Sequence, residues 1–224
     1  MAQSVTTEAL LGPLNEFEQV KSVPKVLYYA GQRDLIRRTP RVSIVGSRDA
    51  SAEALERTRE LALHVADVDG VVVSGLARGV DRAAHEAALE AGSATIAVLG
   101  TPLDRFYPRE HRALQERMMR EQLVLSQFEV GHSPGRSGFV QRNRTMALIS
   151  HATVIMAAGE TSGTQSQAWE AIRLGRALFL HESVANADFA WPHALLHYGA
   201  IPFTSLEDLL ADPLLNPYAE LVWD

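Results

Sequence analysis

Short apolar segments alternate with longer amphipathic segments along the chain from residue 41 to about residue 210. The apolar segments are rich in Val, Ile, Leu and Ala, and most of them end at Gly or Ser. Segments of this length and composition, bounded by such residues, indicate buried β-strands. The predicted strands are 42–45, 71–73, 95–99, 123–126, 152–157 and 177–180.

Helices are predicted between these strands because apolar residues there recur at helical spacing. Ser51 is a good N-cap, and Glu53 lies in the first turn, where a carboxylate is stabilised by the positive end of the helix dipole. Gly92 and Gly175 stand at positions that end helices. The predicted helices cover 81–91, 109–121, 140–150 and 165–174, with one more after Ser51 and a short last helix opened by a capping box at 204–208.

Strands that alternate with helices predict an α/β fold, with an open, mostly parallel sheet that has helices on both faces. Residues 1–40 are interrupted by prolines and contain no strong strand, so we expect an N-terminal extension that packs on the edge of the domain or on a partner. The sheet domain is predicted to cover 41–212, and residues 213–224 are predicted to form a C-terminal tail.

The composition of the 224 residues is that of a globular protein, with 46% hydrophobic and 21% charged residues. The absence of cysteine excludes disulfides and thiolate metal sites and fits a cytoplasmic protein. No apolar run reaches the roughly 18 residues of a membrane span, and the polar start is unlike a signal peptide. The formal net charge is −6, but residues 105–144 carry eight arginines against four acidic residues. This basic segment is either a local anion site or a solvated helix face with mixed charges.

In a parallel sheet, ligands bind outside the carboxyl ends of the strands. The residues that follow the predicted strands are small and polar, which lets backbone N–H groups approach an anion, while Arg48 and Arg78 add guanidinium groups. Each turn alone has an equally good structural explanation, because tight strand-to-helix turns need glycine. The dinucleotide fingerprint and the phosphate-loop motif are both missing, which argues against an ordinary NAD enzyme or P-loop NTPase. The candidate phosphate-binding residues are Gly46, Ser47, Arg48, Ser74, Gly75, Arg78, Gly79, Ser162, Gly163 and Thr164.

The segment 138–144 adds an aromatic residue and two arginines at the start of a predicted helix, after a loop that contains Gly and Pro. An aromatic ring beside arginines can stack a base while the guanidinium groups bind phosphates. The alternative is that the ring fills the core and that the arginines pair with acidic neighbours. The residues added to the candidate nucleic-acid site are Phe139, Arg142, Asn143 and Arg144.

Several of these stretches, taken together and in this order, resemble the DNA-processing protein A (DprA/Smf) family. Each stretch is weak alone, whereas the combination over roughly residues 41–206 is specific. The chain looks like a minimal, divergent member with the Rossmann-like domain only. The matching stretches are 44–48, 72–81, 84–85, 95–100, 107–108, 139–144 and 162–164.

The resemblance implies a Rossmann-like fold, a homodimer, and binding of single-stranded DNA in a positive pocket. It also implies delivery of the strand to a RecA-type recombinase in DNA processing or natural transformation, with no catalytic residue and no cofactor. Asp81 is expected to order its turn, since a carboxylate would repel phosphate. The residues expected to neutralise phosphates are Arg48, Arg78, Arg142 and Arg144.

Two other functions stay open. One is a phosphoribohydrolase that cleaves nucleoside monophosphates, because the loop Ser162–Thr164 is similar to that of the lysine-decarboxylase-like (LOG) enzymes. The catalytic glutamate of those enzymes is replaced by Gln167, which cannot act as a general base, and Glu170 lies one turn further on. The other is a nucleotide-binding or partner-binding module of a mobile-element or defence system that uses the same pocket.

The eight histidines raise the question of a metal site. His193 and His197 have the i, i+4 spacing of zinc-binding helices, but no acidic third ligand lies at a diagnostic spacing. We therefore predict surface or packing histidines and no metal.

Overall fold

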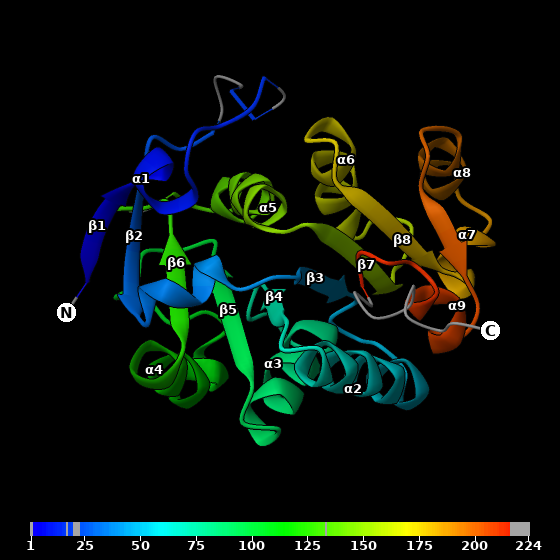
Figure 1. The fold of residues 1–224 in the computed structure, drawn as a ribbon, viewed down its shortest axis with the longest axis horizontal. Helices are drawn as coiled ribbons and strands as arrows, with labels where there is room; N and C mark the ends of the chain where they lie inside the picture. Colours follow the sequence, from blue (N-terminus) through cyan, green and yellow to red (C-terminus); the bar gives the residue numbers. More distant parts are fainter. Residues whose placement is uncertain (1, 17, 20–22, 133, 216–224) are drawn as a thin grey trace.

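A sheet crosses the molecule, and helices pack on both of its faces (Figure 1). The computed structural model describes residues 2–16, 18–19, 23–132 and 134–215. In this part of the chain the sheet has nine strands. They are β1 (Gln3–Thr6), β2 (Val26–Gly31), β3 (Arg41–Gly46), β4 (Val71–Ser74), β5 (Ala94–Leu99), β6 (Leu123–Ser126), β7 (Ala152–Ala157), β8 (Ala177–His181) and β9 (Ile201–Phe203).

The strand order is β1-β2-β6-β5-β4-β3-β7-β8-β9. From β6 to β9 all neighbours are parallel, whereas β1 and β2 are antiparallel additions at one edge. The chain builds outward from β3 through β4, β5 and β6, and then returns to β7 on the other side of β3. The order therefore reverses between β3 and β7, which opens a crevice at their carboxyl ends. The α/β fold with an open, mostly parallel sheet is confirmed.

The helices of the described residues form two layers, one on each face of the sheet (Figure 1). One layer contains α2 (Ala52–Asp67), α3 (Val80–Glu90), α4 (Arg112–Glu121) and α9 (Leu206–Leu210). The other contains α5 (Ser137–Ile149), α6 (Thr164–Arg173), α7 (Glu182–Ala185) and α8 (Ala190–His197). Short helical turns complete the connections, namely α1 (Thr7–Leu11) and the 3-10 turns η1 (Arg33–Arg37) and η2 (Arg109–His111).

The central strands are hydrophobic on both sides because both faces of the sheet are covered. Along β3, Val42 and Ile44 pack with α2 and α3, whereas Val45 joins the core under α5 and α6. All three side chains are buried. This two-sided burial explains why the strands appear in the sequence as continuous apolar runs.

Local signals placed most element ends correctly. The Ser51 hydroxyl accepts a hydrogen bond from the Ala54 N–H at 3.2 Å, as expected of an N-cap. Ser205 and Asp208 form the predicted capping box at the start of α9. The predicted strands 123–126 and 152–157 match β6 and β7, while α5 begins three residues before its predicted start.

Residues 1–40 contain two strands, so the expectation of no strong strand there is wrong. β2 pairs with β6, and β1 pairs with β2. The apolar run Val26–Tyr29 is short and closely follows Pro24, and its extended conformation is fixed by pairing with a strand far along the sequence. Leu27 is fully buried in the main core. The extension lies on the edge of the sheet and continues it.

Three further elements, α7, α8 and β9, lie outside the predicted strands and helices. Trp191 and Leu195 lie one turn apart on α8 and are buried in the core. Pro192 stands in the first turn of this helix, where its missing N–H has no intrahelical partner to lose. Strand β9 is a three-residue edge strand that contains Pro202, as edge strands allow.

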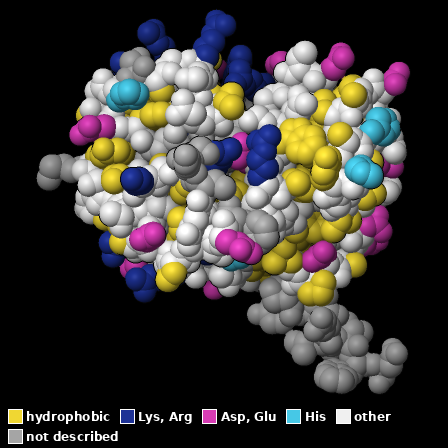
Figure 2. All heavy atoms as spheres, turned by 90° about the horizontal axis from the view of Figure 1, so that it is seen from above, with side chains coloured by type: hydrophobic (Ala, Val, Ile, Leu, Met, Phe, Trp, Pro, Cys, Tyr) yellow, Lys and Arg dark blue, Asp and Glu magenta, His cyan; other side chains and the backbone are white. Residues whose placement is uncertain are grey.

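The outer surface mixes side-chain types. Figure 2 looks onto the face that carries α5, α6 and α8, where hydrophobic, basic and acidic side chains lie interspersed. No helix within the described ranges is long and apolar enough to cross a membrane. Most of the predicted C-terminal tail, residues 216–224, lies outside the described residues.

Shortening Leu27 tests whether β2 belongs to the cooperative core. We expect Leu27→Ala to lower the free energy of unfolding by about 2–5 kcal/mol, because it empties a fully buried position. Val26→Ala changes a neighbouring side chain that is 38% exposed, and should lower the free energy of unfolding by less than about 1 kcal/mol. Urea unfolding followed by circular dichroism measures both values. Equal, small losses would show that β2 lies outside the folding unit.

Candidate functional site

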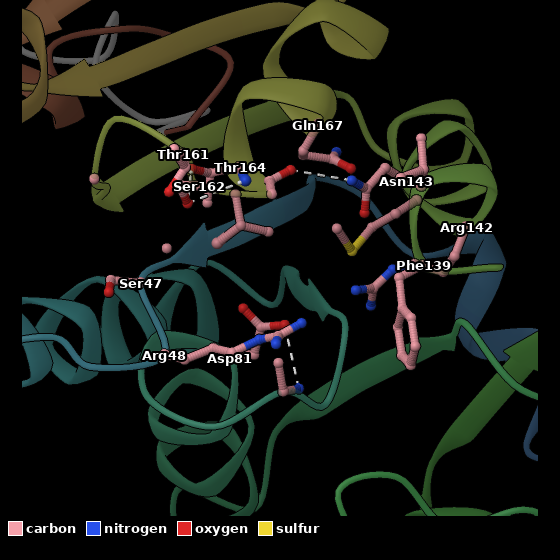
Figure 3. A pocket seen from close by; sticks show the side chains of 17 residues that line it. Ser47, Arg48, Asp81, Phe139, Arg142, Asn143, Thr161, Ser162, Thr164 and Gln167 are labelled. Atoms are coloured by element: carbon pink, nitrogen blue, oxygen red, sulfur yellow. Dashed lines mark hydrogen bonds between the residues drawn. The ribbon is translucent and has the colours of Figure 1, made fainter. Parts of the chain in front are cut away.

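A cavity of about 480 Å³ lies at the carboxyl ends of β3 and β7, where the strand order reverses (Figure 3). Its walls are the turn after β3, the start of α3, one side of α5 and the loop that leads into α6. This is the position expected for a ligand of an open parallel sheet. The lining residues are Val45, Gly46, Ser47, Arg48, Ala77, Asp81, Phe139, Val140, Arg142, Asn143, Met146, Gly159, Thr161, Ser162, Gly163, Thr164 and Gln167.

The turn after β3 is held by backbone contacts on both sides. The Ser47 N–H donates to the Ala157 carbonyl at 2.8 Å, and the Val80 N–H donates to the Ser47 carbonyl at 3.2 Å. Gly79 has a φ of 71°, and a Cβ atom there would lie 2.2 Å from the Ser47 carbonyl oxygen, so this position requires glycine. The turn places Arg48 at the cavity, with its side chain exposed to solvent.

Asp81 fixes the turn between β4 and α3. Its carboxylate accepts hydrogen bonds from the backbone N–H groups of Gly75 at 3.2 Å and Ala77 at 3.3 Å. Burial raises the pKa of Asp81, while the Arg142 guanidinium and these hydrogen bonds favour its charged form. The expectation that Asp81 orders its turn is confirmed.

Arg142 lies beneath the cavity and is only 7% exposed. Its Nη1 donates to the Val98 carbonyl at 2.8 Å. The guanidinium fills the space beside Gly75, where a Cβ atom would lie 1.6 Å from Nη1. Burial lowers the pKa of Arg142, and the nearby Asp81 acts in the opposite direction. Arg142 therefore places a fixed positive charge under the cavity and ties α5 to the ends of β4 and β5.

The loop before α6 forms the opposite wall. The Ser162 hydroxyl accepts hydrogen bonds from the Thr164 N–H at 3.3 Å and from the Thr164 hydroxyl at 2.6 Å. The Asn143 side chain donates to the Gly163 carbonyl at 3.2 Å, which joins α5 to this loop. The cavity thus borders the N-terminal end of α6, where the positive end of the helix dipole favours an anion.

Two of the predicted arginines do not line the cavity. Arg144 donates to both carboxylate oxygens of Glu170, at 2.6 and 2.9 Å, and Arg173 contacts the same carboxylate at 2.9 Å. This is the acidic pairing that the sequence left open as an alternative. Arg78 is exposed and lies 3.8 Å from Glu110. A role of Arg144 and Arg78 in phosphate binding stays a prediction.

Most of the predicted site residues gather around this one cavity. The residues that line it are Gly46, Ser47, Arg48, Phe139, Arg142, Asn143, Ser162, Gly163 and Thr164. The remaining predicted residues lie beside it without lining it, namely Ser74, Gly75, Arg78, Gly79 and Arg144.

Eight lining residues were not among the predicted site residues, namely Val45, Ala77, Asp81, Val140, Met146, Gly159, Thr161 and Gln167. Met146 lies one turn after Arg142 on α5, and Gln167 lies in the first turn of α6. Helical spacing from the residues already selected was the signal that points to both. Gln167 is buried, its Nε2 donates to the Thr153 hydroxyl at 3.4 Å, and its Oε1 has no partner within the described part of the chain.

One buried histidine stands behind the cavity. The Nδ1 of His85 lies 2.7 Å from the Thr95 hydroxyl, which itself donates to the Val72 carbonyl at 2.9 Å, so Nδ1 is the donor. Burial, assisted by the charge of Arg142, lowers the pKa of His85 to about 3. Among the residues that the structure describes, no three metal-ligating side chains stand close enough to share an ion.

An open parallel sheet with a ligand cavity at its switch point defines a Rossmann-like α/β binding protein. The model of the DNA recombination-mediator protein A family matches residues 13–213, and the chain belongs to this family. The resemblance to DNA-processing protein A is thereby confirmed.

The chain is similar in sequence or structure to several members of this family. The chain is 35% identical to DNA processing protein DprA of Streptococcus pneumoniae, over 88% of this chain and 70% of that protein. The X-ray structure of the pneumococcal protein gives a TM-score of 0.80 and covers 94% of this chain and 74% of that one. The structure of DNA processing protein A of Helicobacter pylori, described for its single-stranded DNA binding mode, gives a TM-score of 0.79 at 27% sequence identity. It covers 98% of this chain and 96% of that one. Protein Smf of Synechocystis is 37% identical, over 88% of this chain and 52% of that protein.

Adding one methyl group at Gly75 tests the packing of Arg142. Gly75→Ala should lower the free energy of unfolding by about 1–3 kcal/mol, because its Cβ overlaps the guanidinium and forces Arg142 out of place. Gly159→Ala, whose Cβ would meet nothing within 4 Å, should leave stability within about 0.5 kcal/mol of the parent. Thermal and urea unfolding measure both variants. A Gly75→Ala variant as stable as the parent would contradict the described position of Arg142.

The depressed pKa of His85 predicts a pH dependence of stability. Below about pH 6.5 the unfolded chain protonates this histidine, whereas the folded protein resists protonation down to about pH 3. The free energy of unfolding should therefore fall as the pH falls through this window, by up to about 1.4 kcal/mol per pH unit from this group. His85→Asn should show a shallower slope between pH 7 and 4.5, while His193→Asn, at an exposed position, should keep the parental slope. Identical slopes in all three proteins would exclude His85 as the source.

Proposed function

We propose that this protein binds single-stranded DNA in the cavity, with little dependence on base sequence. The observation that carries the proposal is the meeting of four features in one cavity: the exposed Arg48, the buried Arg142, the N-terminal end of α6 and the ring of Phe139. Positive groups with an aromatic ring are the usual means of holding a strand without reading its sequence. The structure of the Helicobacter pylori relative, which is described for its single-stranded DNA binding mode, covers 98% of this chain and supports this choice of ligand.

Arg48 is the side chain best placed to bind a phosphate. It lines the cavity and is exposed. Its guanidinium can therefore donate two parallel hydrogen bonds to a phosphate without first breaking contacts in the protein core. The opposite wall offers the hydroxyls of Thr161 and Ser162 and the positive end of the α6 helix dipole. A phosphate between these walls would be contacted from both sides.

Arg142 and Arg144 then support binding from behind. Arg142 adds positive potential under the cavity while it keeps its hydrogen bond to Val98. Arg144 holds α5 against α6 through Glu170. In this proposal a strand that leaves the cavity toward α3 passes near Arg78.

Phe139 forms the aromatic side of the cavity (Figure 3). A volume of about 480 Å³ lies in the range of small-molecule sites, and we propose that one nucleotide of a longer strand enters. Paired bases inside a duplex are stacked on both sides and cannot enter such a site without being flipped out. The protein should therefore prefer single-stranded DNA.

Binding without catalysis fits the groups at the cavity. Gln167 is an amide and cannot take up a proton as a base. Asp81 is the acidic residue among the described lining residues, and its carboxylate is engaged by two backbone N–H groups. The carboxylate of Glu170 is bound by two arginines.

We further propose that the protein acts as a homodimer in the cytoplasm and delivers the strand to a RecA-type recombinase. The family's designation as a recombination mediator supports this step. Two cavities on one strand would raise avidity without any new contact. Light scattering of the purified protein, with and without a long oligonucleotide, tests the dimer.

Fluorescence anisotropy of a labelled oligothymidylate, titrated with the protein at two salt concentrations, tests the function. We expect binding that weakens as salt rises and that single-stranded competitor removes better than duplex. Tight binding of a mononucleotide with no gain from longer oligonucleotides would instead favour a nucleotide-binding module. Release of a free base from the mononucleotide would favour a phosphoribohydrolase.

Removing the guanidinium of Arg48 should weaken this binding. Arg48→Ala should raise Kd by roughly tenfold, which corresponds to about 1.4 kcal/mol, and reduce the slope of log Kd against log salt by about 0.7 for one lost phosphate contact. Arg37→Ala is the matched control, because Arg37 is exposed on η1, before β3 rather than at its carboxyl end. Equal affinities of the two variants would exclude Arg48 from the site.

A further inference from the structure

The aromatic surface at the cavity is carried by two rings. The ring centroids of Phe139 and Tyr107 lie 4.9 Å apart and are tilted by 50°. Phe139 is partly buried, because it packs against Gly100, where a Cβ atom would lie 2.5 Å from the Phe139 Cδ1. Tyr107, in contrast, is 50% exposed. Most of the exposed aromatic surface of the pair therefore belongs to Tyr107, outside the cavity.

The loop that carries Tyr107 is firmly built. The Ser126 hydroxyl donates to the Thr101 carbonyl at 2.8 Å, and the Gln115 side chain donates to the Leu103 carbonyl at 3.2 Å. Leu103 itself is buried. A ring on such a loop is positioned in advance and loses little freedom when a ligand binds.

The surroundings of Tyr107 suit a nucleic-acid strand. Val140 lines the cavity next to Phe139 and is 58% exposed, so the apolar surface continues from the cavity outward. The stretch of chain around Tyr107 carries exposed arginines. These arginines are Arg105, Arg109 and Arg112. The guanidinium of Arg112 lies 4.9 Å from the ring centre of Phe106.

We infer that Tyr107 is a second base-binding site, which stacks the base adjacent to the nucleotide held in the cavity. The inference rests on the proposed binding of single-stranded DNA at the cavity. Tyr107 is exposed and contacts Phe139, the aromatic residue of the cavity. The next base of a DNA strand held in the cavity would therefore lie close to the Tyr107 ring. The ligand is a nucleobase of the same strand, read by stacking and without hydrogen-bond specificity.

The test compares a strand that has bases with one that lacks them. The probes are a labelled 12-residue oligothymidylate and a 12-residue oligonucleotide of abasic sites, both measured by anisotropy at low salt. Tyr107→Leu keeps an apolar side chain against Phe139 and removes the stacking surface. We expect it to weaken binding of the oligothymidylate at least about fivefold and to leave the abasic strand unchanged. Tyr107→Trp should restore the parental affinity.

Two controls separate stacking from support of the fold. Tyr198→Leu changes an aromatic residue that is 62% exposed and does not line the cavity, and should alter neither affinity. An equal loss for both strands in Tyr107→Leu would show that Tyr107 only supports Phe139, and no loss for either strand would also overturn the inference. Absence of binding by the parent protein to both strands would instead overturn the proposed function.

Discussion

The buried guanidinium of Arg142 is the interaction on which the cavity depends. It reaches from α5, on one face of the sheet, to the Val98 carbonyl in β5 and to the turn after β4. There its positive charge interacts with the negative charge of Asp81. The Asp81 carboxylate holds the same turn by accepting hydrogen bonds from two backbone N–H groups. Loss of the Arg142 guanidinium would leave the buried Asp81 carboxylate without the positive charge that favours its ionised form, which should destabilise the fold. The helix layers on opposite faces of the sheet are therefore joined electrostatically directly beneath the ligand site.

This arrangement separates two tasks that arginines perform. A buried arginine gives a fixed potential, because its contacts leave it no freedom to follow a ligand, whereas an exposed one can adapt to a flexible strand. Arg142 and Arg48 divide these tasks at one cavity. The aromatic residues divide the surface in a similar way, with Phe139 packed against the backbone of Gly100 and Tyr107 facing solvent.

Local sequence patterns predicted the helices and strands that are determined by residues close by in the sequence. β6, β7 and the Ser51 cap follow from apolar runs and from side chains close by in the sequence. β2 was missed because its pairing partner, β6, lies far along the chain. The site was located at the right sheet edge because parallel sheets bind ligands there, but the burial of Arg142 and the pairing of Arg144 with Glu170 depend on tertiary contacts. Residue type alone does not distinguish a structural arginine from one that is free to bind.

Gly75 and Arg142 occupy one shared volume, and this limits the order in which either can change. A side chain at position 75 fits only after the residue at position 142 has become shorter. A shorter residue at 142, introduced first, leaves a void beside the charge of Asp81. Each single step thus passes through a less stable protein, so the two positions should be inherited as a unit, and a divergent relative that has lost one should have lost the other as well.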